Sequence, residues 1–126
     1  MRRVFSGAPW EGKVGYCRAV RAGGQVHVSG TAPVAPDGST HAPGDAYAQT
    51  RRCAEIALAA LRELGASAAD VVRTRMYVTD ISRWAEYGRA HAEVFGAAPP
   101  ATSMVEVKSL IAPDMLVELE VDAVVE

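Results

Sequence analysis

The chain lacks an excess of positive charge, and it lacks a long apolar run. Its 126 residues hold 13 lysines and arginines against 15 aspartates and glutamates, a formal net charge of −2. Nucleic-acid binding usually needs a basic patch or stripe, so the charge balance does not support such a partner or a ribonuclease. No apolar run approaches the roughly 20 residues of a membrane span, and the first residues lack the apolar core of a signal peptide. We therefore expect a cytoplasmic protein with no membrane partner.

Cysteine is scarce, and residues at metal-ligand spacing are missing. Cys17 and Cys53 are the two cysteines, and in a cytoplasmic chain they are expected to be free thiols. The three histidines fall in different expected elements. No phosphate-binding glycine loop or nucleotide fingerprint occurs, and Ser29 lies in Val-Ser-Gly, not in a nucleophile elbow. These absences predict no metal and no other cofactor, and they leave water activated by a carboxylate as the remaining chemistry.

Regular alternation of apolar and polar residues is what the chain does have. One domain, residues 1–126, suits this length. Alternation predicts strands at residues 3–5, 16–21, 25–29, 71–79, 102–107 and 115–125. Apolar steps of three and four predict one helix from an Asp45 cap to Gly65 and another from Ser82 to Phe95. This order predicts an α+β domain in which two helices pack on one face of a mixed sheet.

Two of the expected strands have one apolar and one charged face. In residues 115–125 the acids Glu118, Glu120 and Asp122 share a face. In residues 71–79, Arg73, Arg75 and Tyr77 form the polar face. The expected apolar face of that strand consists of Val72, Thr74, Met76 and Val78. We expect an open sheet face that carries Arg75, Thr102, Glu118 and Glu120, which needs water or a partner subunit to cover it.

Four segments in this order resemble one known family. They are Val28-Ser29-Gly30, Met76-Tyr77-Val78-Thr79-Asp80, Pro100-Ala101-Thr102-Ser103 with Val105-Glu106-Val107, and the Glu-x-Glu ending at Glu118 and Glu120. Over nearly the whole chain they are similar to the Rid family, the reactive-intermediate deaminases once grouped as endoribonuclease L-PSP-like proteins. The resemblance implies a chorismate-mutase-like fold. It also implies a homotrimer whose sheets enclose a barrel, with a site at each subunit boundary. The two-sided pattern by itself also suits a dimer.

The resemblance also implies the roles of individual residues. Deaminating members of the family grip the substrate carboxylate with an arginine where this chain has Thr102. A glutamate on the last strand handles the water, and Glu118 matches it as the catalytic residue. The expected substrate-binding residues are Tyr16, Ser29, Gly30, Arg75, Thr102, Met104 and Glu120. Arg75, or an arginine of a neighbouring subunit, is the candidate to replace the missing cation.

The sequence therefore predicts a small-molecule partner and leaves two functions open. The first is a Rid-like hydrolase or deaminase of a small imine, enamine or related reactive metabolite. The second is a non-catalytic trimer that binds a small molecule or regulates through it. Thr102 separates the two, because threonine offers a hydroxyl but no charge.

Overall fold

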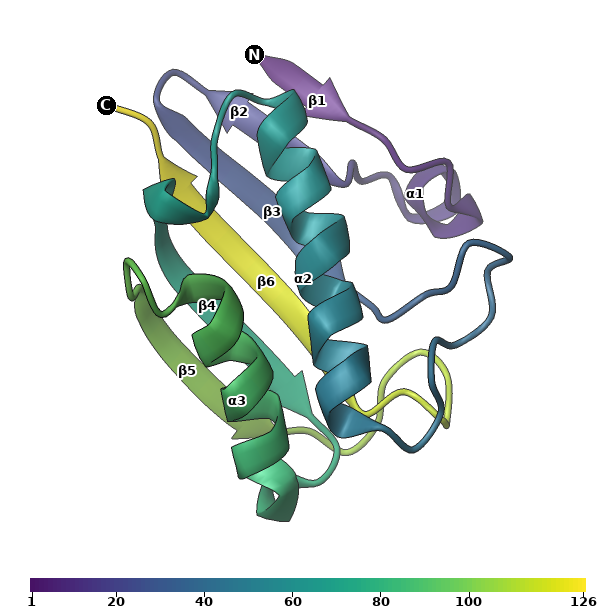
Figure 1. The fold of residues 1–126 in the computed structure, drawn as a ribbon. Coiled ribbons are helices and arrows are strands. Elements are labelled where there is room, and N and C mark those ends of the chain that lie inside the picture. Colours follow the sequence, from purple (N-terminus) through teal and green to yellow (C-terminus); the bar gives the residue numbers. More distant parts are fainter.

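Six strands form one mixed sheet in the order β1-β2-β3-β6-β4-β5. The computed structural model describes residues 1–126 (Figure 1). The strands are β1 (Arg2–Val4), β2 (Ala19–Ala22), β3 (Gln25–Thr31), β4 (Val71–Val78), β5 (Ala101–Glu106) and β6 (Val117–Val124). Strands β4 and β5 are parallel, whereas all other neighbours are antiparallel. The C-terminal strand β6 therefore lies in the middle of the sheet, between β3 and β4.

Two long helices cover one face of this sheet, as the sequence predicts. They are α2 (Ala46–Glu63) and α3 (Trp84–Phe95), which lie side by side over the same face in Figure 1. The buried positions of α2 include Cys53, Ala57 and Leu61, none of them measurably exposed. They pack into a core with the inward side chains of β3, β4 and β6. No helix is both long and apolar enough to cross a membrane.

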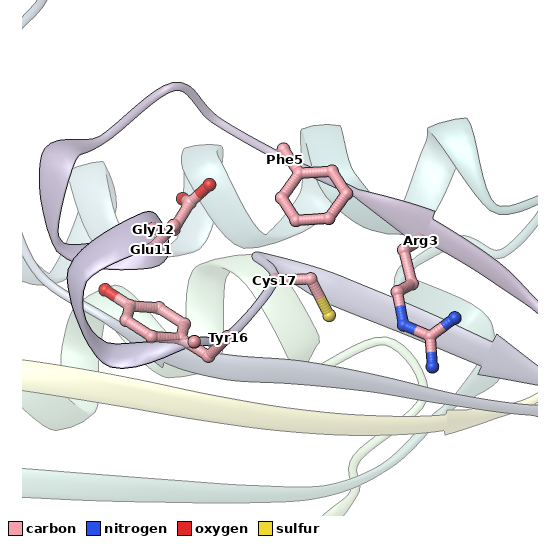
Figure 2. Close-up of a pocket in the computed structure, with 7 residues that line it drawn as sticks. Arg3, Phe5, Glu11, Gly12, Tyr16 and Cys17 are labelled. Atoms are coloured by element: carbon pink, nitrogen blue, oxygen red, sulfur yellow. The ribbon is translucent and has the colours of Figure 1, made fainter.

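A short helix, α1 (Pro9–Val14), follows β1 where the sequence predicts a loop. Glycines at positions 7 and 12 favoured the loop interpretation, but a proline at the first helical position is compatible with a helix. Glu11 on α1 is only 5% exposed and accepts a hydrogen bond from the Ser6 backbone N–H at 3.0 Å. Figure 2 shows Glu11 and Gly12 of α1 above the Tyr16 ring, with Phe5 farther along toward β1.

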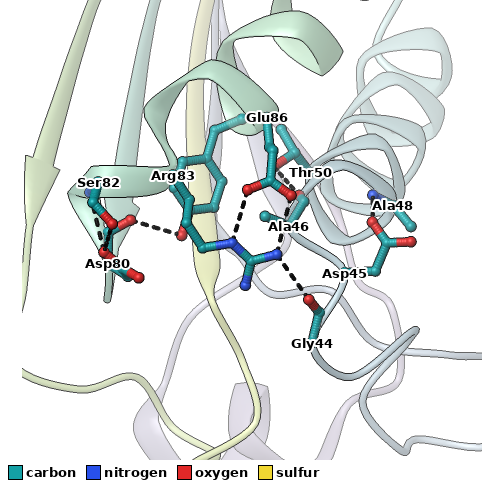
Figure 3. Close-up of polar contacts among 10 residues, drawn as sticks. Gly44, Asp45, Ala46, Ala48, Thr50, Asp80, Ser82, Arg83 and Glu86 are labelled. Carbon is teal, nitrogen blue, oxygen red and sulfur yellow. Dashed lines mark hydrogen bonds and ion pairs between the residues drawn. The ribbon is translucent and has the colours of Figure 1, made fainter.

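A polar side chain caps the start of α2, and another caps the turn that precedes α3 (Figure 3). The Asp45 carboxylate accepts a hydrogen bond from the Ala48 N–H at 2.9 Å, which confirms Asp45 as the cap of α2. The expected Ser82 cap is wrong. A 3₁₀ turn, η2 (Ile81–Arg83), precedes α3, and the Asp80 carboxylate accepts from the Ser82 N–H at 3.0 Å. The Arg83 guanidinium also donates to the Gly44 carbonyl at 2.9 Å, joining the two helix starts.

Strand β4 changes face near its beginning. Its pairing with β6 shifts register between Val71 and Arg73, which is a β-bulge. Val71 is 4% exposed but Val72 is 48% exposed, so the expectation of an inward Val72 is wrong. The turn η1 (Ala68–Asp70) comes directly before this bulge. From Thr74 onward the expected alternation is confirmed, since Thr74, Met76 and Val78 are buried.

The cap at Asp45 gives the first testable prediction. Asp45→Ala is expected to lower the free energy of unfolding by about 1 kcal/mol, because it leaves a helix N–H without its acceptor. Urea denaturation measures this change. Glu63→Ala, which removes a carboxylate with no side-chain hydrogen bond from the other end of α2, is the control and should change stability by less than about 0.5 kcal/mol. Equal effects of the two variants would contradict the capping role.

Candidate functional site

The face of the sheet opposite the helices is charged and has no helix over it. On β6, Val117, Leu119 and Val121 are at most 1% exposed and face the helices. Glu118 and Glu120 alternate with them and therefore face the other way. Across the sheet Glu118 lies beside Tyr77, and Glu120 lies beside Arg75. The structure thus confirms that Arg75, Glu118 and Glu120 share the open face.

Most charges in the middle of this open face are already paired. The Arg75 Nη1 lies 3.2 Å from Asp122 Oδ2, and the His27 Nδ1 lies 2.7 Å from Asp122 Oδ1. The Tyr77 hydroxyl donates to Glu120 Oε1, and this bond raises the pKa of Tyr77. Arg75 is therefore neutralised by Asp122, whereas Glu120 is held by the Tyr77 hydroxyl.

Glu118 is in a different environment from its neighbours. Strand β3 shifts register against β6 between Val28 and Thr31, which places Gly30 against Glu118. A Cβ added to Gly30 would lie 2.7 Å from Glu118 Oε1, so the carboxylate occupies the space that a side chain would need. Burial raises the pKa of Glu118, while the nearby Arg18 cation lowers it and Glu120 raises it. A carboxyl group with a raised pKa is closer to accepting and donating a proton near neutral pH.

Arg18 is the residue of this site that the sequence analysis missed. It is 8% exposed, and its Nη2 donates to the Gly30 carbonyl at 2.5 Å. Its guanidinium carbon lies 5.7 Å from the centre of the Tyr16 ring. The signal was one arginine within an otherwise apolar run, between Cys17 and Ala19. Because the expected strand at residues 16–21 begins at Ala19 instead, Arg18 lies in the segment that leads into β2.

A cavity of about 330 Å³ adjoins this segment between α1 and the end of β1 (Figure 2). Its lining residues are Arg3, Phe5, Glu11, Gly12, Gly15, Tyr16 and Cys17. Tyr16 connects the cavity to Arg18, since its ring faces both. The expected ligand residue Ser29 has a structural contact here, because its hydroxyl donates to the Cys17 carbonyl at 2.7 Å. Cys17 and Cys53 are free thiols, as predicted.

Thr102 lies on the helix-covered side of the sheet, so the expectation that it shares the open face with Glu118 is wrong; Met104 lies on the same side as Thr102. In the parallel pairing of β4 and β5, Thr102 lies beside the buried Thr74, and Met104 lies beside Met76. The Thr102 and Thr74 hydroxyls are 2.6 Å apart, and Thr74 Oγ1 is 2.7 Å from His91 Nε2 on α3. Burial lowers the pKa of His91, which favours its neutral form as a partner for Thr74.

The expected site residues therefore form two sets in one chain. In the first set, Tyr16, Gly30 and Glu118 lie around Arg18. Ser29 precedes Gly30 on β3, and Arg75 on β4 lies beside Glu120 on β6. Thr102 and Met104 are on the opposite face of the edge strand β5, with β4 between them and β6. No three histidine, cysteine or carboxylate side chains lie close enough together to hold a metal ion.

Together these features define a class: an α+β domain with one sheet, one helix-covered face and one open, charged face that carries a half-buried carboxylate. Comparison with known proteins identifies the family. The endoribonuclease L-PSP family model matches residues 8–125. The chain belongs to this family, also called the Rid or YjgF/YER057c/UK114 family.

Three relatives illustrate the similarity. The Streptomyces coelicolor protein SCO2049 is 38% identical over 123 residues, which cover 98% of this chain and 91% of the relative. The RutC family protein PYRAB12510 of Pyrococcus abyssi is 36% identical over 105 residues, with 83% and 82% coverage. The crystal structure of Rv2704 from Mycobacterium tuberculosis, a YjgF/YER057c/UK114 family member, superposes with a TM-score of 0.89 at 52% identity. That match covers 98% of both chains.

The raised pKa of Glu118 predicts how stability depends on pH. A carboxyl group whose pKa is higher in the folded state than in the unfolded state binds more protons when folded. Its contribution therefore falls as pH rises from the ordinary value of 4.5 through the raised value. The free energy of unfolding of Glu118→Gln minus that of the wild type should therefore be larger at about pH 7 than at about pH 4.

Urea denaturation at both pH values tests this prediction. Glu63→Gln, which changes an exposed glutamate on α2, controls for the loss of one carboxylate. If the gain of Glu118→Gln over the wild type is the same at both pH values, Glu118 does not have a raised pKa in the folded protein.

Proposed function

We propose that the protein is a Rid-like hydrolase that deaminates small imines or enamines, with Glu118 as the group that handles the water. The observation that carries this proposal is the half-buried Glu118 carboxylate beside Gly30, with a pKa raised by burial. A general acid and base works best when its pKa is near the working pH. Membership of the Rid family supports the same chemistry.

The reaction needs one group that takes a proton and returns it. The Glu118 carboxylate removes a proton from water as the water oxygen forms a bond to the carbon of C=N, and the C=N electron pair moves to nitrogen. Glu118 then returns the proton to nitrogen, which gives a carbinolamine. In a second transfer Glu118 takes the proton of the carbinolamine hydroxyl and gives it to nitrogen, the oxygen electron pair forms C=O, and the C–N bond breaks to release ammonia and a carbonyl product. An enamine first tautomerises to the imine. The net reaction converts imine and water into ketone and ammonia.

We further propose that the pocket is completed between subunits of a homotrimer. The separation of the expected site residues onto two faces supports this, because Thr102 cannot reach Glu118 around β4 within one chain. The strands β1 and β5 are edges with no strand beyond them, so a second copy can lie against either. The open charged face would then line the inside of the assembly.

Turnover of freshly generated 2-iminopropionate tests the catalytic role. Glu118→Gln is expected to slow hydrolysis by at least about 100-fold, because general acid–base catalysis typically contributes that much or more. The rate is measured as ammonia release above the spontaneous decay in buffer. Glu63→Gln should retain the wild-type rate, and an active Glu118→Gln protein would reject the proposed role.

The second candidate, a binding protein without catalysis, is favoured by Thr102. Its hydroxyl is hydrogen-bonded to Thr74, and it provides no charge for a substrate carboxylate. Losing a charge-assisted contact of about 2–3 kcal/mol weakens transition-state binding of a 2-imino acid by roughly 30- to 150-fold. A ligand could then be held without being turned over.

Thr102→Arg distinguishes the two candidates. If the site is catalytic and no other cation holds the substrate carboxylate, adding the arginine should increase hydrolysis of 2-iminopropionate, by up to about 100-fold. Thr102→Gln is the matched control, because it adds length and loses the Thr74 contact without adding a charge. No gain over Thr102→Gln, in a protein whose wild type binds ligands by thermal shift but releases no ammonia above the spontaneous rate, would favour the binding function.

A further inference from the structure

Arg18 is a buried cation that forms no ion pair within the chain, although it lies near enough to Glu118 for the two charges to interact. It is 8% exposed, and no aspartate or glutamate oxygen lies within 4.0 Å of its guanidinium. The one hydrogen bond of its guanidinium goes from Nη2 to the neutral carbonyl of Gly30. Its buried Nε–H has no hydrogen-bond partner.

Such an arrangement is unfavourable unless an anion completes it. Burying a charge is costly unless it is paired, and buried polar groups are normally hydrogen-bonded. A guanidinium presents five N–H donors in a planar fork that matches a carboxylate. In Arg18 one of these donors is used, by a group that carries no charge.

The surroundings of Arg18 place it in the candidate site. Gly30 contacts both charged groups, because its carbonyl accepts from Arg18 while the Glu118 carboxylate lies against its Cα. On the other side, the Tyr16 ring lies against Arg18 and lines the cavity next to α1. An anion on Arg18 would therefore lie within reach of Glu118 and have an aromatic wall beside it.

We propose that Arg18 is an anion-binding residue of this site and takes the carboxylate of a small 2-oxo or 2-imino acid. In such an acid the C=O or C=N carbon is bonded directly to the carboxylate carbon, which suits the closeness of Arg18 and Glu118. The cation that position 102 lacks is then supplied from the segment leading into β2. Arg75 is the weaker candidate, because its charge is already paired with Asp122 at 3.2 Å. The imino-acid part of this assignment rests on the proposed function.

Pyruvate is the probe, because it is a stable 2-oxo acid that needs no turnover, and pyruvamide is its uncharged counterpart. Titration calorimetry with the full chain at fixed ionic strength should show pyruvate binding more tightly than pyruvamide. Arg18→Gln should weaken pyruvate binding by about 10- to 100-fold and leave pyruvamide unchanged. Arg18→Lys should bind pyruvate with an affinity between those of the wild type and Arg18→Gln, since it keeps the charge but loses the planar guanidinium fork. Arg62→Gln, which removes an exposed arginine on α2, should bind as the wild type does.

Several outcomes would overturn the proposal, and the comparison of the two probes in the wild type does not depend on Arg18→Gln folding. If the wild type binds the two probes equally, or Arg18→Gln binds pyruvate like the wild type, Arg18 is not an anion site. If Arg18→Gln changes the oligomeric state by light scattering and the wild type does not prefer pyruvate, a neighbouring subunit neutralises Arg18. Preferential binding through Arg18 without imine hydrolysis would keep the anion site and reject the proposed activity.

Discussion

The pairing of β6 between β3 and β4 is the constraint on which the rest of the structure depends. This strand sends Val117, Leu119 and Val121 into the core and Glu118 and Glu120 to the open face. Because side chains alternate along a strand, a shift of one residue would exchange the two sets. The same register therefore fixes the hydrophobic core and brings the candidate carboxylate to Gly30.

Much of the fold was predictable because its elements have strong periodicity. Helix α2 and strand β6 have clear apolar faces, and Asp45 is a good cap, so these predictions were confirmed. The errors occur where local geometry breaks the period. The bulge at Val72 reverses a face without any change in composition. Helix α1 is too short to show a pattern, and a 3₁₀ turn capped by Asp80 precedes α3, so Ser82 does not cap that helix.

The candidate site was predictable in part. Glu118 could be placed by alternation and resemblance, whereas alternation on the edge strand β5 does not say which face meets the helices. Thr102 was therefore assigned to the wrong side. Arg18 was missed because its importance comes from a carbonyl twelve residues away and from the absence of any carboxylate within ion-pair distance of it. The amino-acid sequence alone cannot show that a charged side chain lacks an ion-pair partner.

The contact between Gly30 and Glu118 also has a consequence for how these two positions evolve. A side chain at position 30 would occupy the space that the carboxylate now fills. The two positions are therefore coupled: a lineage that keeps the Glu118 carboxylate in its present place has to keep glycine at 30. A lineage that replaces the glutamate with a shorter residue becomes free to acquire a side chain there. Paired change at these two positions would mark relatives that have given up the carboxylate.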